Sequence, residues 1–340
     1  MTRILLLSPR IVGVGGIAQH VRQLAKRLRS CGYEVHLISS ETLGLTLRKG
    51  LMNPGYALAS SAHLLGRGYD VVHGHNLPSA PALKLTDARL KILTLHGIYS
   101  RQIGLLYGDA LGSIARAVES ILLREVDVVT AVTVEAARYY ERLGVDVRYI
   151  PNAIDLSEMP RDGVRISDPQ IIYLGRLSRE KGVDLLVEAA MLGLRGVVVA
   201  GDGPLRPLIE RASRRGLVRY LGPLPRWRAL RLLAGSDVAV LPSREEGVST
   251  ALLEAMALKI PVVATRVGGN LEVVRDGVDG ILVRPDASEL VDAVERLLMD
   301  RDYAGRLSRN AFKRVLENYS WDKVFMEYLK LYRSVPDRDS

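Results

Sequence analysis

Residues 245–269 read EEGVSTALLEAMALKIPVVATRVGG, and this stretch sets the expectation for the whole fold. It follows an apolar run at 238–241 and contains a second one at 262–264. Between the two runs lies a segment of helical length, which begins after Ser249 or Thr250, and hydroxyl residues cap helices well. Two short strands joined through a helix form a βαβ unit, so the stretch predicts a parallel sheet.

The same alternation of short apolar runs and helix-length segments extends in both directions along the chain. It predicts an α/β protein with two Rossmann-like, doubly wound domains. The turn-rich residues 151–163 interrupt the pattern, and we place the domains at 1–157 and 158–319. The predicted strands are 4–7, 35–38, 71–73, 92–95, 126–130 and 147–150 in the first domain, and 171–174, 196–200, 218–221, 238–241, 262–264 and 281–283 in the second.

The last helical segment carries an apolar stripe that needs a partner surface. Helical spacing brings its members onto one face of the helix. These members are Trp321, Val324, Phe325, Tyr328, Leu329 and Tyr332.

Composition restricts the class of protein and its partners. The chain has 340 residues and a formal net charge of +9, which favours anionic partners. The surplus is spread over both halves and aromatic residues are few, which argues against a nucleic-acid partner. The single cysteine, Cys31, favours a reducing cytoplasmic location, and no apolar run approaches the ~18 residues of a spanning helix. At most, we expect peripheral contact with the inner membrane surface.

A glycine-rich loop follows the first predicted strand and contains Gly13, Gly15 and Gly16. Glycines let the backbone approach a phosphate, and the following helix offers free N–H groups. The spacing also fits the dinucleotide fingerprint of NAD-binding proteins. However, the acidic residue expected ~20 positions on is missing, because Glu34 precedes the second strand and Glu41 lies past it. A structural turn is the remaining alternative.

Two further loops of the second domain combine glycines with charge. Arg176 and Lys181 bracket the loop after the strand at 171–174, and a guanidinium with an ammonium can clamp a diphosphate. Solvated surface charges explain the same residues. The glycines that accompany these loops are Gly175, Gly201 and Gly203, the last two flanking Asp202.

The opening stretch places Glu246 in a loop ahead of the helix and Glu254 inside it. Helix N–H groups can hold a phosphate. The carboxylates of Glu246, before the helix, and Glu254, inside it, can accept hydrogen bonds from sugar hydroxyls. The alternative makes Glu254 an ordinary exposed helix residue. The backbone candidates here are Gly247, Val248, Ser249 and Thr250.

Three histidines, His73, His75 and His96, end two predicted strands of the first domain. A zinc-type metal triad is one interpretation. Hydrogen bonding to a ligand in a cleft is the other, and it is the one we favour.

Five loops, in order, resemble the retaining glycosyltransferases of family 4, which have the two-domain GT-B fold. The matching pieces are GGIAQHV, LTLHG, IPNAID, GRLSREKGVD with VAGDGPL, and the stretch EEGVSTALLEAMALKIPVVATRVGGNLEVVRDGVDGILV. The resemblance implies that two Rossmann-like domains face each other across a cleft. It also implies sugar transfer from a nucleotide diphosphate donor with retention of configuration, without a metal or other cofactor.

The resemblance also assigns roles to individual residues. Gly15 and Gly16 would meet the diphosphate, and Arg176 with Lys181 would neutralise it. Glu246 would hold hydroxyls of the donor sugar and Glu254 the ribose, while His96 would lie beside the reacting sugar. The carboxy-terminal helix, about 320–336, would cross back onto the first domain.

One position departs from the family pattern. Where the family has glycine after the helix, this chain has Lys259. A helix end that favours a left-handed residue would strain lysine modestly.

The donor base remains open between UDP and GDP, and the acceptor is a carbohydrate or a lipid-linked hydroxyl. We place His75 and Arg101 on the acceptor side. Basic residues beside apolar ones in the irregular segments 41–69 and 98–112 suggest a membrane glycolipid acceptor. Buried helices flanked by solvated charges explain the same residues equally well. A sugar-nucleotide epimerase, a glycogen or disaccharide synthase, and a nucleotide-binding module without turnover are the alternative functions.

Overall fold

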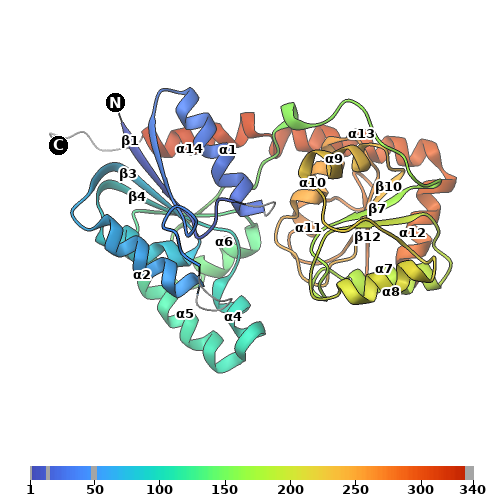
Figure 1. The fold of residues 1–340 in the computed structure, drawn as a ribbon. Coiled ribbons are helices and arrows are strands. Elements are labelled where there is room, and N and C mark those ends of the chain that lie inside the picture. The colour runs from blue at the N-terminus through green and yellow to red at the C-terminus, as the bar shows by residue number, and fades with distance from the viewer. Residues whose placement is uncertain (1, 13–15, 47–51, 334–340) are drawn as a thin grey trace. The chain divides into compact units, whose positions relative to one another are not determined.

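The computed structural model describes residues 2–12, 16–46 and 52–333, and it divides into two compact units. Unit 1 contains residues 1–152 and 324–340, and unit 2 contains residues 153–323. Each unit is built on one parallel sheet with flanking helices (Figure 1). This α/β architecture confirms the predicted fold class.

The sheet of unit 1 has the order β2-β1-β3-β4-β5-β6 within the described residues. Its strands are β1 (Arg3–Leu7), β2 (Glu34–Ile38), β3 (Gly68–His75), β4 (Asp87–Leu95), β5 (Val128–Ala131) and β6 (Val147–Tyr149). The connecting helices are α1 (Gly16–Ser30), α2 (Met52–Leu64), η1 (Leu77–Ser79), α3 (Ala80–Leu85), α4 (Tyr99–Tyr107), α5 (Asp109–Leu123) and α6 (Val134–Glu141). The register pairs Ile4 with Val35 on one side and with Val71 on the other.

The sheet of unit 2 has the order β12-β11-β10-β7-β8-β9. Its strands are β7 (Ile171–Leu174), β8 (Val197–Ala200), β9 (Arg219–Tyr220), β10 (Val238–Leu241), β11 (Val262–Thr265) and β12 (Ile281–Val283). Its helices are η2 (Leu156–Glu158), α7 (Val183–Met191), α8 (Arg206–Arg214), α9 (Arg226–Ala234), α10 (Thr250–Ala257), α11 (Asn270–Val273), α12 (Ala287–Met299) and α13 (Arg301–Asn318).

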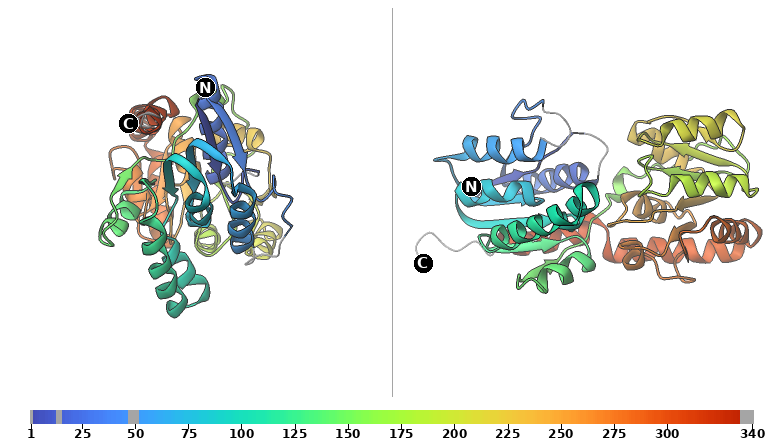
Figure 2. Two further views of the ribbon diagram at one scale, coloured as in Figure 1. Left: turned by 90° about the vertical axis from the view of Figure 1, so that its left-hand side faces the viewer. Right: turned by 90° about the horizontal axis from the view of Figure 1, so that it is seen from below.

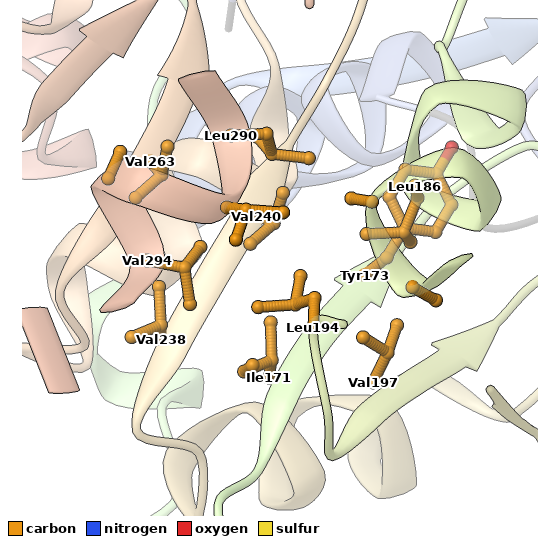
Figure 3. Close-up of a cluster of buried hydrophobic side chains, with 14 of the residues drawn as sticks. Ile171, Tyr173, Leu186, Leu194, Val197, Val238, Val240, Val263, Leu290 and Val294 are labelled. Carbon is orange, nitrogen blue, oxygen red and sulfur yellow. The ribbon is translucent and has the colours of Figure 1, made fainter. Parts of the chain in front are cut away.

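The core of unit 2 lies between the strands and the helices that cover them. Val238 and Val240 of β10 pack with Leu290 and Val294 of α12, and all four side chains are at most 3% exposed (Figure 3). Removing such apolar surface from water is the main stabilising term of the fold. The continuous apolar runs of the sequence are therefore strands buried on both faces.

The last helix, α14 (Trp321–Arg333), begins in unit 2 and continues in unit 1. All six members of its predicted apolar stripe are at most 7% exposed, which confirms that the stripe packs against a partner surface. No helix within the described ranges is long and apolar enough to cross a membrane.

Lys259, which follows α10, adopts the left-handed conformation with φ 59°, as its position at a helix end predicts. Its ammonium lies 4.6 Å from the centre of the Phe312 ring. This cation–π contact partly offsets the cost of a non-glycine residue in that conformation.

Candidate functional site

Unit 2 has a topological switch point between β7 and β10, where the chain changes the direction in which it adds strands. In open α/β sheets, ligands bind outside the carboxyl ends of the strands at such a point. Here the loops after β7 and β10 are joined, because the backbone N–H groups of Arg244 and Glu245 both donate to the carbonyl of Glu180. Gly182 has φ +65°, and a Cβ there would lie 1.7 Å from the Pro242 oxygen, so only glycine permits this approach.

The neighbouring loops continue this arrangement on both sides of the switch point. Leu177 donates to the carbonyl of Asp202 over 2.9 Å, which links the loops after β7 and β8. Gly269 donates to the carbonyl of Glu246 over 3.0 Å, which links the loops after β11 and β10. The loops after β7, β8 and β10, together with the first residue of α10, carry the predicted donor residues Gly175, Arg176, Lys181, Gly201, Asp202, Gly203, Glu246, Gly247, Val248, Ser249 and Thr250.

Lys181 and Glu246 form an ion pair across the switch point. The ammonium Nζ lies 2.6 Å from Oε1 of Glu246, and Ser243 donates its hydroxyl to Oε2 over 3.0 Å. The Glu246 side chain is 8% exposed and that of Lys181 28%, so the pair is partly shielded from water. Arg176 is exposed and pairs with Glu180 at 3.4 Å. The two predicted cations thus lie at the same strand edge, and one of them already holds the predicted sugar-binding carboxylate.

Glu254 is buried inside α10, so the alternative that it is an exposed helix residue is wrong. Ser249 caps this helix as predicted, accepting from the N–H of Leu252. The carboxylate of Glu254 pairs with Arg226, whose Nη2 also lies 3.4 Å from Glu158. Sequence reasoning missed Arg226, and the only local signal was its place just after Pro225 at the start of a helix.

Unit 1 has its own switch point between β1 and β3. The predicted phosphate loop lies after β1, and Gly15 falls outside the described residues. Gly16 is described and begins α1, so it provides one of the free N–H groups at the amino terminus of that helix.

His96 follows β4 and is partly exposed, whereas His75 at the end of β3 is fully buried behind it. Nδ1 of His75 lies 3.2 Å from Nε2 of His96. The N–H of His96 donates to the side chain of Asn76, a residue with φ 64° that fixes the turn after β3. Burial lowers the pKa of His96, so its ring is neutral near pH 7.

The metal-triad interpretation of the histidines does not fit the geometry. Both ring nitrogens of His73 are engaged, Nδ1 by the Tyr332 hydroxyl at 2.6 Å and Nε2 by Thr94 at 2.7 Å. Across the described ranges, no three His, Cys, Asp or Glu side chains are arranged to hold a metal ion.

Arg101, the other predicted acceptor-side residue, lies in α4 and pairs with Glu135 of α6. Both side chains are about half exposed. The pair therefore leaves the guanidinium within reach of solvent.

The two parallel six-stranded sheets with their flanking helices have the two-domain GT-B fold of solved glycosyltransferases. The sequence profile described as "Glycosyl transferases group 1" matches residues 168–300, and that of "Glycosyltransferase Family 4" matches residues 14–158. The chain belongs to this family, and it is a glycosyltransferase that uses a sugar-nucleotide donor.

Individual relatives agree with this assignment. The chain is 28% identical to a D-inositol 3-phosphate glycosyltransferase of Nocardia farcinica, over 96% of this chain and 86% of the relative. Sucrose-phosphate synthase of Thermosynechococcus elongatus has a similar fold, with TM-score 0.84, 23% identity and 98% of both chains covered. The Anabaena protein HepE, solved with UDP and glucose, matches with TM-score 0.74 and 18% identity, over 98% of this chain and all of that one.

Proposed function

We propose that this glycosyltransferase moves a sugar from a UDP-sugar to a hydroxyl acceptor with retention of the anomeric configuration. The ion pair between Lys181 and Glu246 at the switch point of unit 2 is the observation that carries this proposal. In the proposed site, Lys181 is the cation for the leaving diphosphate and the adjacent Glu246 is the carboxylate for the sugar hydroxyls. The structural neighbour solved with UDP and glucose supports uracil as the donor base.

Departure of a diphosphate develops negative charge on its oxygens, and fixed positive groups stabilise that charge. Lys181 and Arg176 supply them in the proposed site. The free N–H groups ahead of α10, around Ser249 and Thr250, add the positive end of the helix dipole. Glu254, held by Arg226, is assigned to the ribose hydroxyls.

Retention ordinarily suggests a carboxylate nucleophile on the face opposite the leaving group. In this structure both carboxylate oxygens of Glu246 are engaged, by Lys181 and by Ser243. That arrangement favours a holding role for Glu246 over a nucleophilic one. We therefore propose the front-face route, in which the departing phosphate accepts the proton of the acceptor hydroxyl.

Sugar nucleotides are expected to raise the melting temperature of the protein. At about 100-fold excess over the dissociation constant a ligand adds about 2.7 kcal/mol, which corresponds to roughly 5–10 °C for a unit of this size. The measurement is a thermal-shift panel of UDP-glucose, UDP-galactose, UDP-N-acetylglucosamine, GDP-mannose, ADP-glucose and NAD. A shift with NAD alone would contradict the proposed donor class, and a shift with GDP-mannose alone would contradict the base.

For the acceptor we propose a lipid-linked hydroxyl at a membrane surface. The solvent-facing side of α5 carries Leu111, Ile114, Val118 and Ile121, which are 44–64% exposed and repeat at helical spacing. Together α4 and α5 project from the rest of unit 1 (Figure 2). An exposed apolar helix face on a protein with net charge +9 suits the interface of an anionic bilayer. Arg48 and Lys49, the adjacent basic residues within the segment 41–69, lie outside the described residues.

The double substitution Ile114→Ser with Ile121→Ser is expected to weaken vesicle binding at least fivefold, because it removes two of the apolar side chains that would enter the interface. Co-sedimentation with vesicles of phosphatidylglycerol and phosphatidylcholine at low salt measures this. Met299→Ser is the matched control, since Met299 is 77% exposed and lies in unit 2. Absence of binding by the unaltered protein would contradict the membrane acceptor.

Two alternatives remain distinguishable in solution. Incubation with the sugar nucleotide alone, followed by sugar analysis, detects an epimerase. A soluble acceptor that supports full turnover would favour a synthase, and glycogen synthase of Mycobacterium tuberculosis is a relative at 28% identity over 97% of this chain.

A further inference from the structure

Four imidazoles gather at the carboxyl edge of the unit 1 sheet. His20 comes from α1, His73 and His75 from β3, and His96 from the residue after β4. The rings of His73 and His75 stack with centroids 4.4 Å apart, and the centroids of His75 and His96 are 5.5 Å apart. His20, His73 and His75 are at most 4% exposed, whereas His96 is partly exposed. A substrate can therefore reach His96, and the buried rings can act on it only through His96.

Tyr332 of α14 fixes the protonation pattern at the far end of this cluster. Its hydroxyl is 2.6 Å from Nδ1 of His73 and has no other hydrogen-bond partner among the described residues, so its buried proton is satisfied only by donation to Nδ1. Nε2 of His73 must then carry the proton and donate to Thr94, 2.7 Å away, and Thr94 is 2.6 Å from Thr130. This pattern satisfies each of these contacts without leaving the Tyr332 proton or the His73 proton unbonded in the core.

His75 connects His73 to His96, and its own protonation determines which nitrogen of His96 carries a proton. Its Nδ1 lies 3.2 Å from Nε2 of His96, and its own Nε2 is buried without a partner among the described residues. A buried N–H without an acceptor is costly, so the proton of His75 belongs on Nδ1, where it is donated to His96. His96 then carries its proton on Nδ1. The plane of His75 is set by its stacking on His73, with 28° between the rings.

We propose that Tyr332 is a positioning residue for sugar transfer: by fixing His73, on which His75 stacks, it sets the ring plane and the tautomer of His96. This inference rests on the proposed role of His96 beside the reacting sugar. Second-layer groups of this kind orient a reacting imidazole without touching the substrate.

The test combines imidazole ¹⁵N NMR with kinetics on the full chain. In the unaltered protein labelled at histidine, His73 should be protonated on Nε2 and His75 on Nδ1. In Tyr332→Phe the His73 signals should change to a mixture of tautomers. The kcat for UDP release, measured with the UDP-sugar that gives the largest thermal shift, should fall about 10- to 100-fold, while KM for that donor stays within about twofold.

Tyr56→Phe is the matched control, because Tyr56 is also a fully buried tyrosine of unit 1 and its hydroxyl lies 3.5 Å from the Ile38 carbonyl. It should leave the histidine tautomers and kcat unchanged. His73 protonated on Nδ1 in the unaltered protein would overturn the inference, even if Tyr332→Phe failed to fold. A normal kcat in Tyr332→Phe, together with loss of transfer in His96→Ala, would also overturn the inference. Normal transfer by His96→Ala would instead overturn the proposed role of His96.

Discussion

Replacing Lys181 with methionine is expected to reduce kcat/KM for sugar transfer by about 100- to 1,000-fold, the range measured when one preorganised charge-stabilising group is removed. The ammonium lies at the switch point of unit 2, where the proposed diphosphate departs, and a methionine side chain has similar length without the charge. Glu246→Gln is expected to have a comparable effect through lost sugar hydroxyl contacts. The measurement is UDP release with the UDP-sugar that gives the largest thermal shift.

Lys181→Met also leaves the Glu246 carboxylate, which is 8% exposed, without its cation and with Ser243 as its side-chain partner among the described residues. An unpaired buried charge destabilises the fold, and this instability contributes to the loss of transfer in the single variant. The double variant Lys181→Met with Glu246→Gln removes both charges and should restore the melting temperature while transfer stays lost. Lys313→Met is the matched control, since Lys313 is 72% exposed and lies 3.9 Å from Glu317 on α13. Transfer within twofold of normal in both Lys181→Met and Glu246→Gln would refute the site.

Acidification is expected to destabilise unit 1 selectively. Burial lowers the pKa of His20, His73 and His75 below the ordinary value of 6.5, and that of His73 falls to about 3. The unfolded chain therefore binds more protons than the folded one between about pH 6.5 and the folded pKa values, so stability falls as pH falls through that window. Each imidazole that stays neutral when folded costs on the order of 1 kcal/mol between pH 7.5 and 5.5. The three together are expected to cost a few kcal/mol, roughly three times that.

Unit 2 provides the internal control for this prediction, because all six histidines of the sequence lie in unit 1. Amide hydrogen exchange at the two pH values, corrected for intrinsic rates, should show protection lost in the strands of unit 1 and kept in β7, β10 and β11. Equal loss in both units would contradict the histidine origin of the effect.

The strands were readable from sequence because parallel strands buried on both faces are short continuous apolar runs. The stripe of α14 was readable because helical spacing reveals a buried face even when the partner surface is unknown. The loops that carry Lys181, Glu246 and Glu254 followed from their place after predicted strands and from the family resemblance. The pairing of Lys181 with Glu246 could not be predicted from the sequence, because the two residues are 65 positions apart and only the order of strands in the sheet brings them together.

Other features of the site depend on contacts that no local pattern encodes. Arg226 holds Glu254 and Glu158 from 28 and 68 positions away. The burial of His75 behind His96 depends on how the ends of β3 and β4 align in the sheet, where His75 pairs with Thr94. A single sequence shows which residue types follow a strand, and it does not show which of them face solvent.

The core of unit 1 is closed by residues of α14, which follow unit 2 along the chain. Tyr328 and Tyr332 are fully or almost fully buried against His20 and His73, yet more than 170 residues of unit 2 separate them from Asn152. On the ribosome residues 1–152 therefore emerge with part of their apolar interior exposed, while unit 2 can complete its own fold before α14 is made. Synthesis of α14, rather than emergence of residues 1–152, sets when unit 1 can mature.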